Sequence, residues 1–325
     1  MDFNQIIGHE KIIGILKNAI KCNHIFHCYL FAGEESVGKR LVALAFAKAL
    51  LCKREDVKPC NKCTSCLKFN SFNHPDFELI EPEDGSIPKK RIDDLIKSMA
   101  IAPLESKRRI IIIDQCDKMR IEAQNELLKT LEEPPLYVNM ILITSNSNGL
   151  IPTILSRSQV IKFHPVESKK IVQLLMGEYN KTEEEANFIA HFTKGSVGRS
   201  IALSKSPDFF NMREDVLSII HKVVTGDKMN IMNSVDFFVE NKDSIDKIMD
   251  IILYWFRDLI IYKEIGDSNL IINKDKIQIL SRQSFLNIGR INDIIEYIIK
   301  TKDYVKNNVN FQLAIEAMLL KIQEV

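Results

Sequence analysis

The chain has 325 residues, which is enough for two or three domains. Apolar residues make up 46% and charged residues 27%, ordinary values for a globular protein, and no apolar stretch approaches the length that spans a bilayer. The formal net charge is only +1, which argues against a chain that binds duplex DNA unaided, so any nucleic-acid role is expected to be shared with partners. The first residues lack the basic and apolar regions of a signal peptide, and we therefore expect a cytoplasmic protein without membrane contacts.

Residues 1–165 are predicted to form an α/β domain. Short apolar runs end in small or acidic residues, and helical patterns separate them. Continuous runs of this kind are typical of a parallel sheet covered by helices on both faces. The runs expected to be strands are 29–32, 77–80, 109–113, 139–144 and 159–163.

Beyond residue 165 the pattern is helical. Helices are predicted over 168–179 and 182–192, and the second begins with a capping box made by Thr182 and Glu185. From about residue 209 to the end the helical pattern continues, with Ile288, Ile291, Ile295 and Ile298 forming one apolar stripe. The expected layout is therefore an α/β domain (1–165), a small helical domain (166–208) and a helical C-terminal domain (209–325).

A phosphate-binding loop follows the first predicted strand. Gly33, Gly38 and Lys39 fit the spacing G-x4-G-K, and the helical run 41–51 comes next. The glycines let backbone N–H groups turn towards phosphate oxygens, the helix N-terminus adds partial positive charge, and Lys39 can reach the β- and γ-phosphates. The alternative is a glycine-rich turn that only resembles such a loop.

Two positions of this loop system are unsuited to hydrolysis. Arg40 stands where a Ser or Thr hydroxyl would coordinate Mg²⁺, and a guanidinium cannot ligate a cation. Asp114 follows the strand 109–113, at the position of the aspartate that helps to coordinate Mg²⁺ in hydrolytic P-loop proteins. Gln115 comes next, in place of a glutamate that would polarise the attacking water. The alternative for Asp114 is that it merely ends a core strand.

Four of the seven cysteines cluster in the sequence. Cys52, Cys60, Cys63 and Cys66 have the spacing C-x7-C-x2-C-x2-C, and polar residues separate them. Zn²⁺ prefers four thiolates in a tetrahedron, so the spacing predicts a structural zinc site at about 52–66; a redox pair would need only two cysteines. The remaining cysteines, Cys22, Cys28 and Cys116, are expected to be packing residues.

Together these motifs resemble the bacterial clamp-loader AAA+ family of DNA polymerase III. Residues 6–9 (IIGH) are similar to the segment that contacts adenine in nucleotide-binding members, and residues 125–135 (NELLKTLEEPP) are close to the family's most recognisable string. The four-cysteine module after the loop helix is typical of two of its branches. Residues 154–158 (ILSRS) match its Ser-Arg-Cys motif, with Ser158 in place of the cysteine.

The resemblance implies specific roles. Arg157 would be an arginine finger that reaches the ATP site of a neighbouring subunit, where it stabilises charge on the transferring phosphoryl group. Residues 144–146 correspond to the first nucleotide sensor. Arg199 corresponds to the second but is shifted by one position, which puts contact with a γ-phosphate in doubt.

The resemblance also implies an assembly. Domain 166–208 would be a lid, and domain 209–325 a collar that holds a hetero-pentameric ring of gamma/tau and delta subunits. The ring would load a sliding clamp onto primer-template DNA during replication.

Two rival functions stay open from the sequence. One is a gamma/tau-type motor subunit, which Arg40 and Gln115 argue against. The other is a stand-alone P-loop enzyme, which the collar-like C-terminal third disfavours. The favoured interpretation is a stator that scaffolds the ring. Binding of ATP through Gly33, Gly38 and Lys39 without hydrolysis is compatible with it.

Overall fold

The computed structural model describes residues 2–54, 58–226, 229–266, 270–307 and 309–324, and for 229–233 the backbone only. It divides into two compact units, Met1–Ile171 with Gly195–Arg199, and Val172–Lys194 with Ser200–Val325. The three-domain boundaries expected from the sequence stay predictions. Residues 55–57 of the expected zinc module, and 227–228, 267–269, 308 and 325 of the expected collar, lie outside the described residues.

The first unit is built on a parallel sheet of five strands, in the order β2-β3-β4-β1-β5. The predicted parallel α/β sheet is thus confirmed, and no predicted strand is missing. The strands are β1 (Cys28–Ala32), β2 (Phe77–Ile80), β3 (Arg109–Ile113), β4 (Val138–Thr144) and β5 (Gln159–Lys162).

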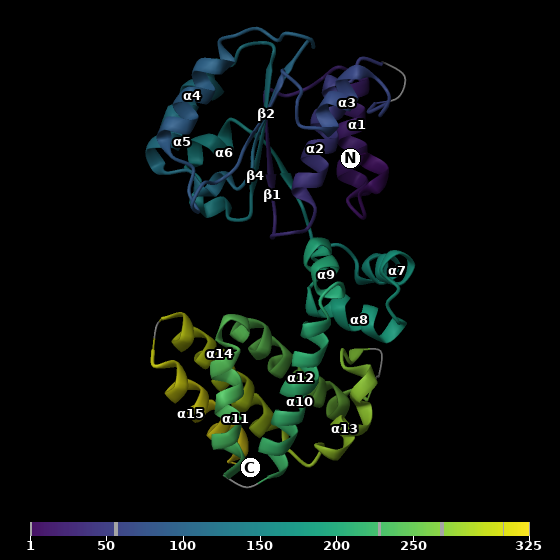
Figure 1. The fold of residues 1–325 in the computed structure, drawn as a ribbon, viewed down its shortest axis with the longest axis vertical. Coiled ribbons are helices and arrows are strands. Elements are labelled where there is room, and N and C mark those ends of the chain that lie inside the picture. The colour runs from purple at the N-terminus through teal and green to yellow at the C-terminus, as the bar shows by residue number, and fades with distance from the viewer. Residues whose placement is uncertain (1, 55–57, 227–228, 267–269, 308, 325) are drawn as a thin grey trace. The chain divides into compact units, whose positions relative to one another are not determined.

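Helices cover both faces of this sheet (Figure 1). One face carries α1 (Glu10–Lys21), α2 (Lys39–Leu51) and α3 (Thr64–Asn70); the other carries α4 (Lys89–Met99), α5 (Ile121–Glu132) and α6 (Pro152–Ser156). All residues of β1 and β4 are buried, because these strands lie inside the sheet, whereas edge strand β5 buries only Ile161. This explains why the inner strands read as continuous apolar runs. The short helices are η1 (Phe3–Gln5), η2 (Cys116–Lys118) and η3 (Ser147–Gly149).

The second unit is helical in its described residues. Helix α8 (Glu183–Phe192) starts with the predicted capping box, in which Thr182 and Glu185 satisfy each other's backbone N–H groups. Helices α7 (Ser168–Tyr179) and α9 (Val197–Ser204) cross from one unit to the other. The remaining helices are α10 (Pro207–Thr225), α11 (Met229–Glu240), η4 (Lys242–Ser244), α12 (Ile245–Glu264), η6 (Lys274–Lys276), α13 (Ile277–Arg282), α14 (Ile288–Lys306) and α15 (Phe311–Gln323).

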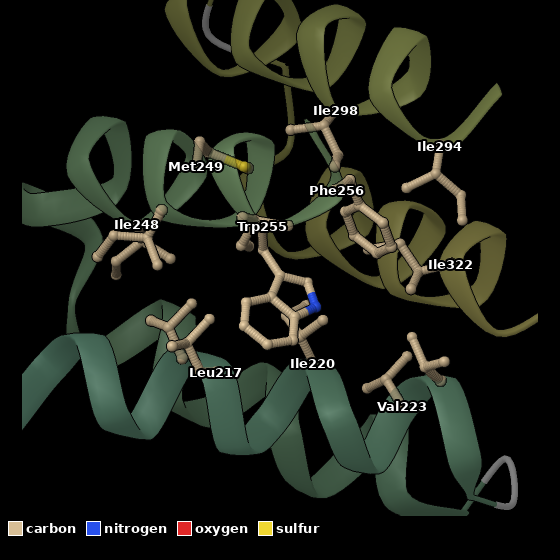
Figure 2. Packing of buried hydrophobic residues seen from close by; sticks show 14 of the residues in the cluster. Leu217, Ile220, Val223, Ile248, Met249, Trp255, Phe256, Ile294, Ile298 and Ile322 are labelled. Carbon is tan, nitrogen blue, oxygen red and sulfur yellow. The ribbon is translucent and has the colours of Figure 1, made fainter. Parts of the chain in front are cut away.

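Trp255 of α12 lies at the centre of the core of this unit (Figure 2). Its side chain is 1% exposed, and its indole N–H donates to Oε1 of Gln283 at 2.8 Å, so the one polar atom of the ring is satisfied. Helix α14 turns Ile291, Ile294 and Ile298 into the core. The predicted stripe is confirmed at Ile291, Ile295 and Ile298, since Ile295 is partly buried and packs against this core, and the helix adds Ile294 to it.

No helix among the described residues is long and apolar enough to cross a membrane.

Candidate functional site

The predicted phosphate loop connects β1 to α2 at the carboxyl edge of the sheet. A Cβ at Gly33 would lie 2.4 Å from the carbonyl oxygen of Phe163, so only glycine fits where the chain leaves the strand. Gly38 has φ +110° and precedes α2 as its N-cap residue. The first N–H groups of α2 therefore face the loop, in the arrangement that binds anions.

Lys39 is folded onto this loop. Its Nζ donates to the carbonyl oxygens of Gly33 and Glu34, both at 2.6 Å. Burial lowers the pKa of Lys39, and the nearby carboxylate of Asp114 opposes that shift. The ammonium group thus lies where it can meet a phosphate group held by the loop, as its place in the motif predicts.

Arg40 makes an internal ion pair at the position of the missing hydroxyl. Its Nη1 contacts Oδ2 of Asp114 at 3.2 Å and a carboxylate oxygen of Glu81 more closely. Burial raises the pKa of Asp114, and the positive charge of Arg40 works against that rise. The structure therefore brings Arg40 and Asp114 together, and a side chain supplies the cation that neutralises the buried carboxylate.

The positions beside Asp114 also depart from a hydrolytic site. Gln115 is exposed and has φ +49°, and its amide can neither accept a proton as a carboxylate does nor carry negative charge. Thr144, at the end of β4, donates from Oγ1 to Oδ1 of Asp117 at 2.6 Å. The expected first sensor thus lies close to the end of β3, with its hydroxyl engaged by a carboxylate.

Two distant segments meet the phosphate loop. His9 contacts the carbonyl oxygen of Val37 through Nε2 at 2.8 Å, and the backbone N–H of Gly198 donates to the carbonyl oxygen of Ser36 at 2.9 Å. The segments that resemble the adenine contact and the second sensor therefore both lie against the loop. The side chain of Arg199 is exposed. Its role as a sensor stays a prediction.

Arg157 lies at the end of α6, on the surface of the first unit. Its Nη2 contacts Oε1 of Glu132, the last residue of α5, at 2.7 Å, and 36% of its side chain is exposed. The neighbouring Ser158, which replaces the cysteine of the motif, donates to the carbonyl oxygen of Ile154 and touches Sγ of Cys28. The arginine is thus held at a helix end with its charge accessible to solvent.

The four clustered cysteines converge in space. Their Sγ atoms all lie within 4.8 Å of one another, although the residues come from the end of α2, the following loop and α3. Thiolates around tetrahedral Zn²⁺ have Zn–S distances of about 2.3 Å and so lie roughly 3.8 Å apart. The Sγ atoms of Cys60 and Cys66 are 3.9 Å apart. A hydrogen bond from the backbone N–H of Lys62 contributes most to lowering the pKa of Cys60, to about 6. The donor set therefore fits zinc.

The remaining cysteines divide. Cys28 and Cys116 are buried packing residues, as predicted, but the prediction for Cys22 was wrong. Cys22 is exposed because it follows the last residue of α1, where the chain turns away from the core.

The structure adds two acidic residues that the motifs did not identify, Glu81 and Asp117. Glu81 directly follows β2, and Asp117 lies three residues beyond Asp114. Because β2 and β3 are parallel neighbours, their ends meet at one edge of the sheet. An acidic residue directly after each of two adjacent strands was the signal available for Glu81.

The fold and these loops define a P-loop α/β domain joined to a helical unit. The chain belongs to the DNA polymerase III delta subunit family: the family model described as "DNA polymerase III, delta subunit" matches residues 8–167, and the model for its C-terminal part matches residues 207–324. The family expected from the motifs is thereby confirmed.

The curated relatives agree with this membership. The DNA polymerase III subunit delta′ of Bacillus subtilis is 30% identical over 97% of this chain and 96% of its own length. The tau subunit of the same organism is 28% identical over 98% of this chain, which spans 61% of that relative. The structure of a gamma-subunit-related protein from Thermotoga maritima is 16% identical over 95% of this chain and 98% of its own, with a TM-score of 0.41. The assignment rests on the sequence relatives.

Proposed function

We propose that this chain is the delta-prime-type subunit of a bacterial clamp loader and acts as a stator. In this role it stands in a ring with gamma/tau-type and delta subunits that loads a sliding clamp onto primed DNA. The kinship to a delta′ subunit over nearly the whole of both chains supports the assignment. The observation that carries the stator role is the ion pair between Arg40 and Asp114.

The reasoning follows from charge. In a hydrolytic P-loop a hydroxyl and the aspartate hold Mg²⁺ between them. Here Arg40 gives the aspartate its counter-charge and offers no lone pair to a metal ion. Gln115 removes the group that would polarise water, so two separate steps of hydrolysis are impaired. The backbone N–H groups and Lys39 remain available to phosphate oxygens, which leaves nucleotide binding compatible with the stator role.

The gamma/tau-type motor is the second candidate, because a tau subunit is 28% identical over 98% of this chain. ATP hydrolysis by the purified full-length chain, alone and mixed with gamma/tau-type and delta subunits, separates the two. We expect no Mg²⁺-dependent turnover by the chain alone above that of a Lys39→Ala variant, and stimulated clamp loading when the chain joins the other subunits. Hydrolysis by the isolated chain that Lys39→Ala abolishes would establish the motor instead.

We also propose that Cys52, Cys60, Cys63 and Cys66 hold a structural Zn²⁺. The convergence of four sulfur atoms within 4.8 Å supports this site. A bound zinc ion would cross-link the end of α2 to α3, and with four protein ligands it would leave no position for a reactive water.

In the same proposal Arg157 is the finger offered to a neighbouring ATP site. Its place at the end of α6, half exposed and held by Glu132, supports that role, because a guanidinium paired with a surface carboxylate can exchange that partner for a phosphoryl group. The segment around Arg199 and the helical unit are the corresponding candidates for a second sensor and for the collar that holds the ring together.

A further inference from the structure

A basic cavity lies at the amino ends of the strands, whereas the phosphate loop lies at their carboxyl ends. It has a volume of about 1100 Å³ and lies entirely within the first unit. Asn23, Arg108 and Leu136 precede β1, β3 and β4, so the loops that enter three adjacent strands line it. The phosphate loop and Asp114 follow β1 and β3, and Thr144 is the last residue of β4, so all three lie at the other ends of the same strands. The cavity is therefore separate from the candidate nucleotide site, and it exceeds the roughly 300–1,000 Å³ typical of small-molecule pockets.

The lining of this cavity, which we call the basic groove, concentrates positive charge. Among the described residues that line it, Glu105 is the one carboxylate residue. The whole chain is nearly neutral, with 44 basic and 43 acidic residues, so the described lining of the groove is more basic than the composition. The basic lining residues are Lys17, Lys21, Lys53, Lys58, Lys107 and Arg108.

Most of this charge has no acidic partner among the described residues. Arg108 donates to amide oxygens, Oδ1 of Asn139 at 2.9 Å and Oδ1 of Asn23 at 3.2 Å, which orient the guanidinium and leave its charge uncompensated. Lys53 lies 4.0 Å from Glu105, and that carboxylate is engaged more closely by Lys68, outside the lining. A concave surface with uncompensated cations raises the local concentration of anions.

The backbone just before Lys107 and Arg108 is held in place by the side chain of Asp76. The buried carboxylate of Asp76 accepts hydrogen bonds from the backbone N–H groups of Leu104, Glu105 and Ser106, at 2.6, 2.9 and 2.7 Å. Burial opposes ionisation of Asp76, but these three donors outweigh it and keep the pKa of Asp76 below its ordinary value. The basic side chains therefore project from a fixed backbone, which reduces the entropy lost when a ligand binds.

We propose that the basic groove binds a short stretch of single-stranded nucleic acid through its phosphates. This inference rests on the proposed function, which brings the chain to primed DNA. Five of the six cations are lysines, flexible point charges that suit phosphate contacts without sequence selectivity. The apolar lining residues Ile20, Leu50 and Leu136 offer surface to the faces of the bases.

An acidic peptide is the competing occupant, and the position of the groove disfavours it. An extended peptide gains affinity by pairing with an unpaired sheet edge. The groove lies at the ends of β3, β4 and β1, which are inner strands whose backbone groups are paired on both sides. An extended polyanion that binds here gains no main-chain pairing and depends mainly on its charges, which a regular phosphate backbone supplies most densely.

The test is the affinity of the full-length chain for a fluorescent oligothymidylate of about 15 nucleotides, within the range of known single-strand site sizes. Anisotropy is measured from low to moderate salt for the wild type, for Lys21→Glu with Lys107→Glu, and for Lys11→Glu. Lys11 lies at the other end of α1 and outside the groove, so its reversal measures the effect of a net-charge change of about 2 per lysine, half of that in the double variant, away from the groove. A Lys21→Gln with Lys107→Gln variant covers the case in which charge reversal disturbs folding, which thermal melts would reveal.

We expect the double charge reversal to weaken binding at least tenfold at low salt, whereas Lys11→Glu changes it less than twofold. The slope of log affinity against log salt should fall by about 1.4, since each phosphate contact contributes roughly 0.7 for single strands. Equal affinities for the groove variant and the control, or no measurable binding by the wild type, would overturn the proposal. As a competitor, poly-glutamate is compared with unlabelled oligothymidylate at equal concentrations of negative charge. If poly-glutamate displaces the labelled oligonucleotide at the lower concentration, the occupant is an acidic peptide and the proposal is overturned.

A parallel pull-down with gamma/tau-type and delta subunits separates this proposal from the proposed function. If both the wild type and the groove variant assemble with these subunits, and the groove variant binds the oligonucleotide as tightly as the wild type, only the proposal of nucleic-acid binding by the groove is refuted. If the wild type does not assemble with these subunits, the clamp-loader role is refuted, regardless of the affinity measured for the oligonucleotide.

Discussion

Replacing Arg157 by alanine should separate the chemistry of the ring from the stability of this chain. The ion pair between Arg157 and Glu132 is half exposed, with 36% and 49% of the two side chains accessible. Pairs of this kind contribute about 0–1 kcal/mol, so the variant should unfold within ~1 kcal/mol of the wild type. An arginine finger contributes on the order of 10³ to 10⁵ in rate, or about 4–7 kcal/mol of activation free energy.

The assay is steady-state, DNA-stimulated ATP hydrolysis by the reconstituted clamp loader carrying each variant, with assembly checked by size-exclusion chromatography. Glu132→Ala is the matched control, because it breaks the same ion pair but leaves the guanidinium in place. We expect a large loss of hydrolysis with Arg157→Ala, poor rescue by Arg157→Lys, which lacks the planar fork, and little change with Glu132→Ala. Unchanged hydrolysis with Arg157→Ala in an intact complex would reduce this arginine to a surface residue.

Three further outcomes follow from buried or clustered side chains. Asp76→Asn should lower the free energy of unfolding at pH 7 by about 2–4 kcal/mol, because backbone donors lose a charged acceptor. The pKa of Asp76 is lowered in the folded state, so this carboxylate contributes fully to the free energy of unfolding above the ordinary pKa of 3.8, and the contribution is lost as the pH falls through the folded pKa. In urea unfolding across this pH range, the free energy of unfolding of the variant should therefore depend less on acid than that of the wild type. Parallel pH curves for the two proteins would contradict the role of Asp76. Cys66→Ser should reduce the zinc released from the unfolded protein from one equivalent to near none while far-ultraviolet circular dichroism keeps the sheet signal; a metal-free wild type purified without oxygen would contradict the zinc site. Trp255→Ala should cost about 3–5 kcal/mol in the same urea assay, and a loss under ~1 kcal/mol would mean that the core closes over the cavity.

The sheet was predictable because its strands obey one simple rule. Inner strands of a parallel sheet are apolar on both faces, and the run 109–113 matched the inner strand β3 residue for residue. The run 77–80 matched β2 equally well, although β2 is an edge strand and only partly buried. Strand ends were less certain. β1 begins at Cys28, one residue earlier than predicted, and the sequence did not show this because a cysteine at that position is compatible with either a strand or a loop. In the helical unit, Ile294 packs in the core beside the predicted stripe, because the neighbours of α14 cover a wider face of the helix than periodicity alone specifies.

The candidate nucleotide site was visible in the sequence because its residues lie in short motifs, whereas the contacts between motifs were not. Arg40 was expected to block a metal ligand position, but its pairing with Asp114, 74 residues away, follows only from the order of the strands. The basic groove was missed for the same reason. Its lysines are scattered over residues 17–107, and a net charge of +1 gave no hint that the fold gathers them.

The ion pair of Arg40 also bears on how this chain could change over evolutionary time. A single substitution of Arg40 by threonine would restore the metal-binding hydroxyl, but it would leave Glu81 and Asp114 facing each other without their shared cation. Like charges at close range oppose each other, and Asp114 is already costly to ionise because it is buried. Recovery of hydrolysis also needs a carboxylate at Gln115, so the first step of the return path is unfavourable and brings no activity. In the proposed stator, a return to hydrolysis is therefore disfavoured, because the arginine that occupies the metal-ligand position also supplies the counter-charge of Glu81 and Asp114.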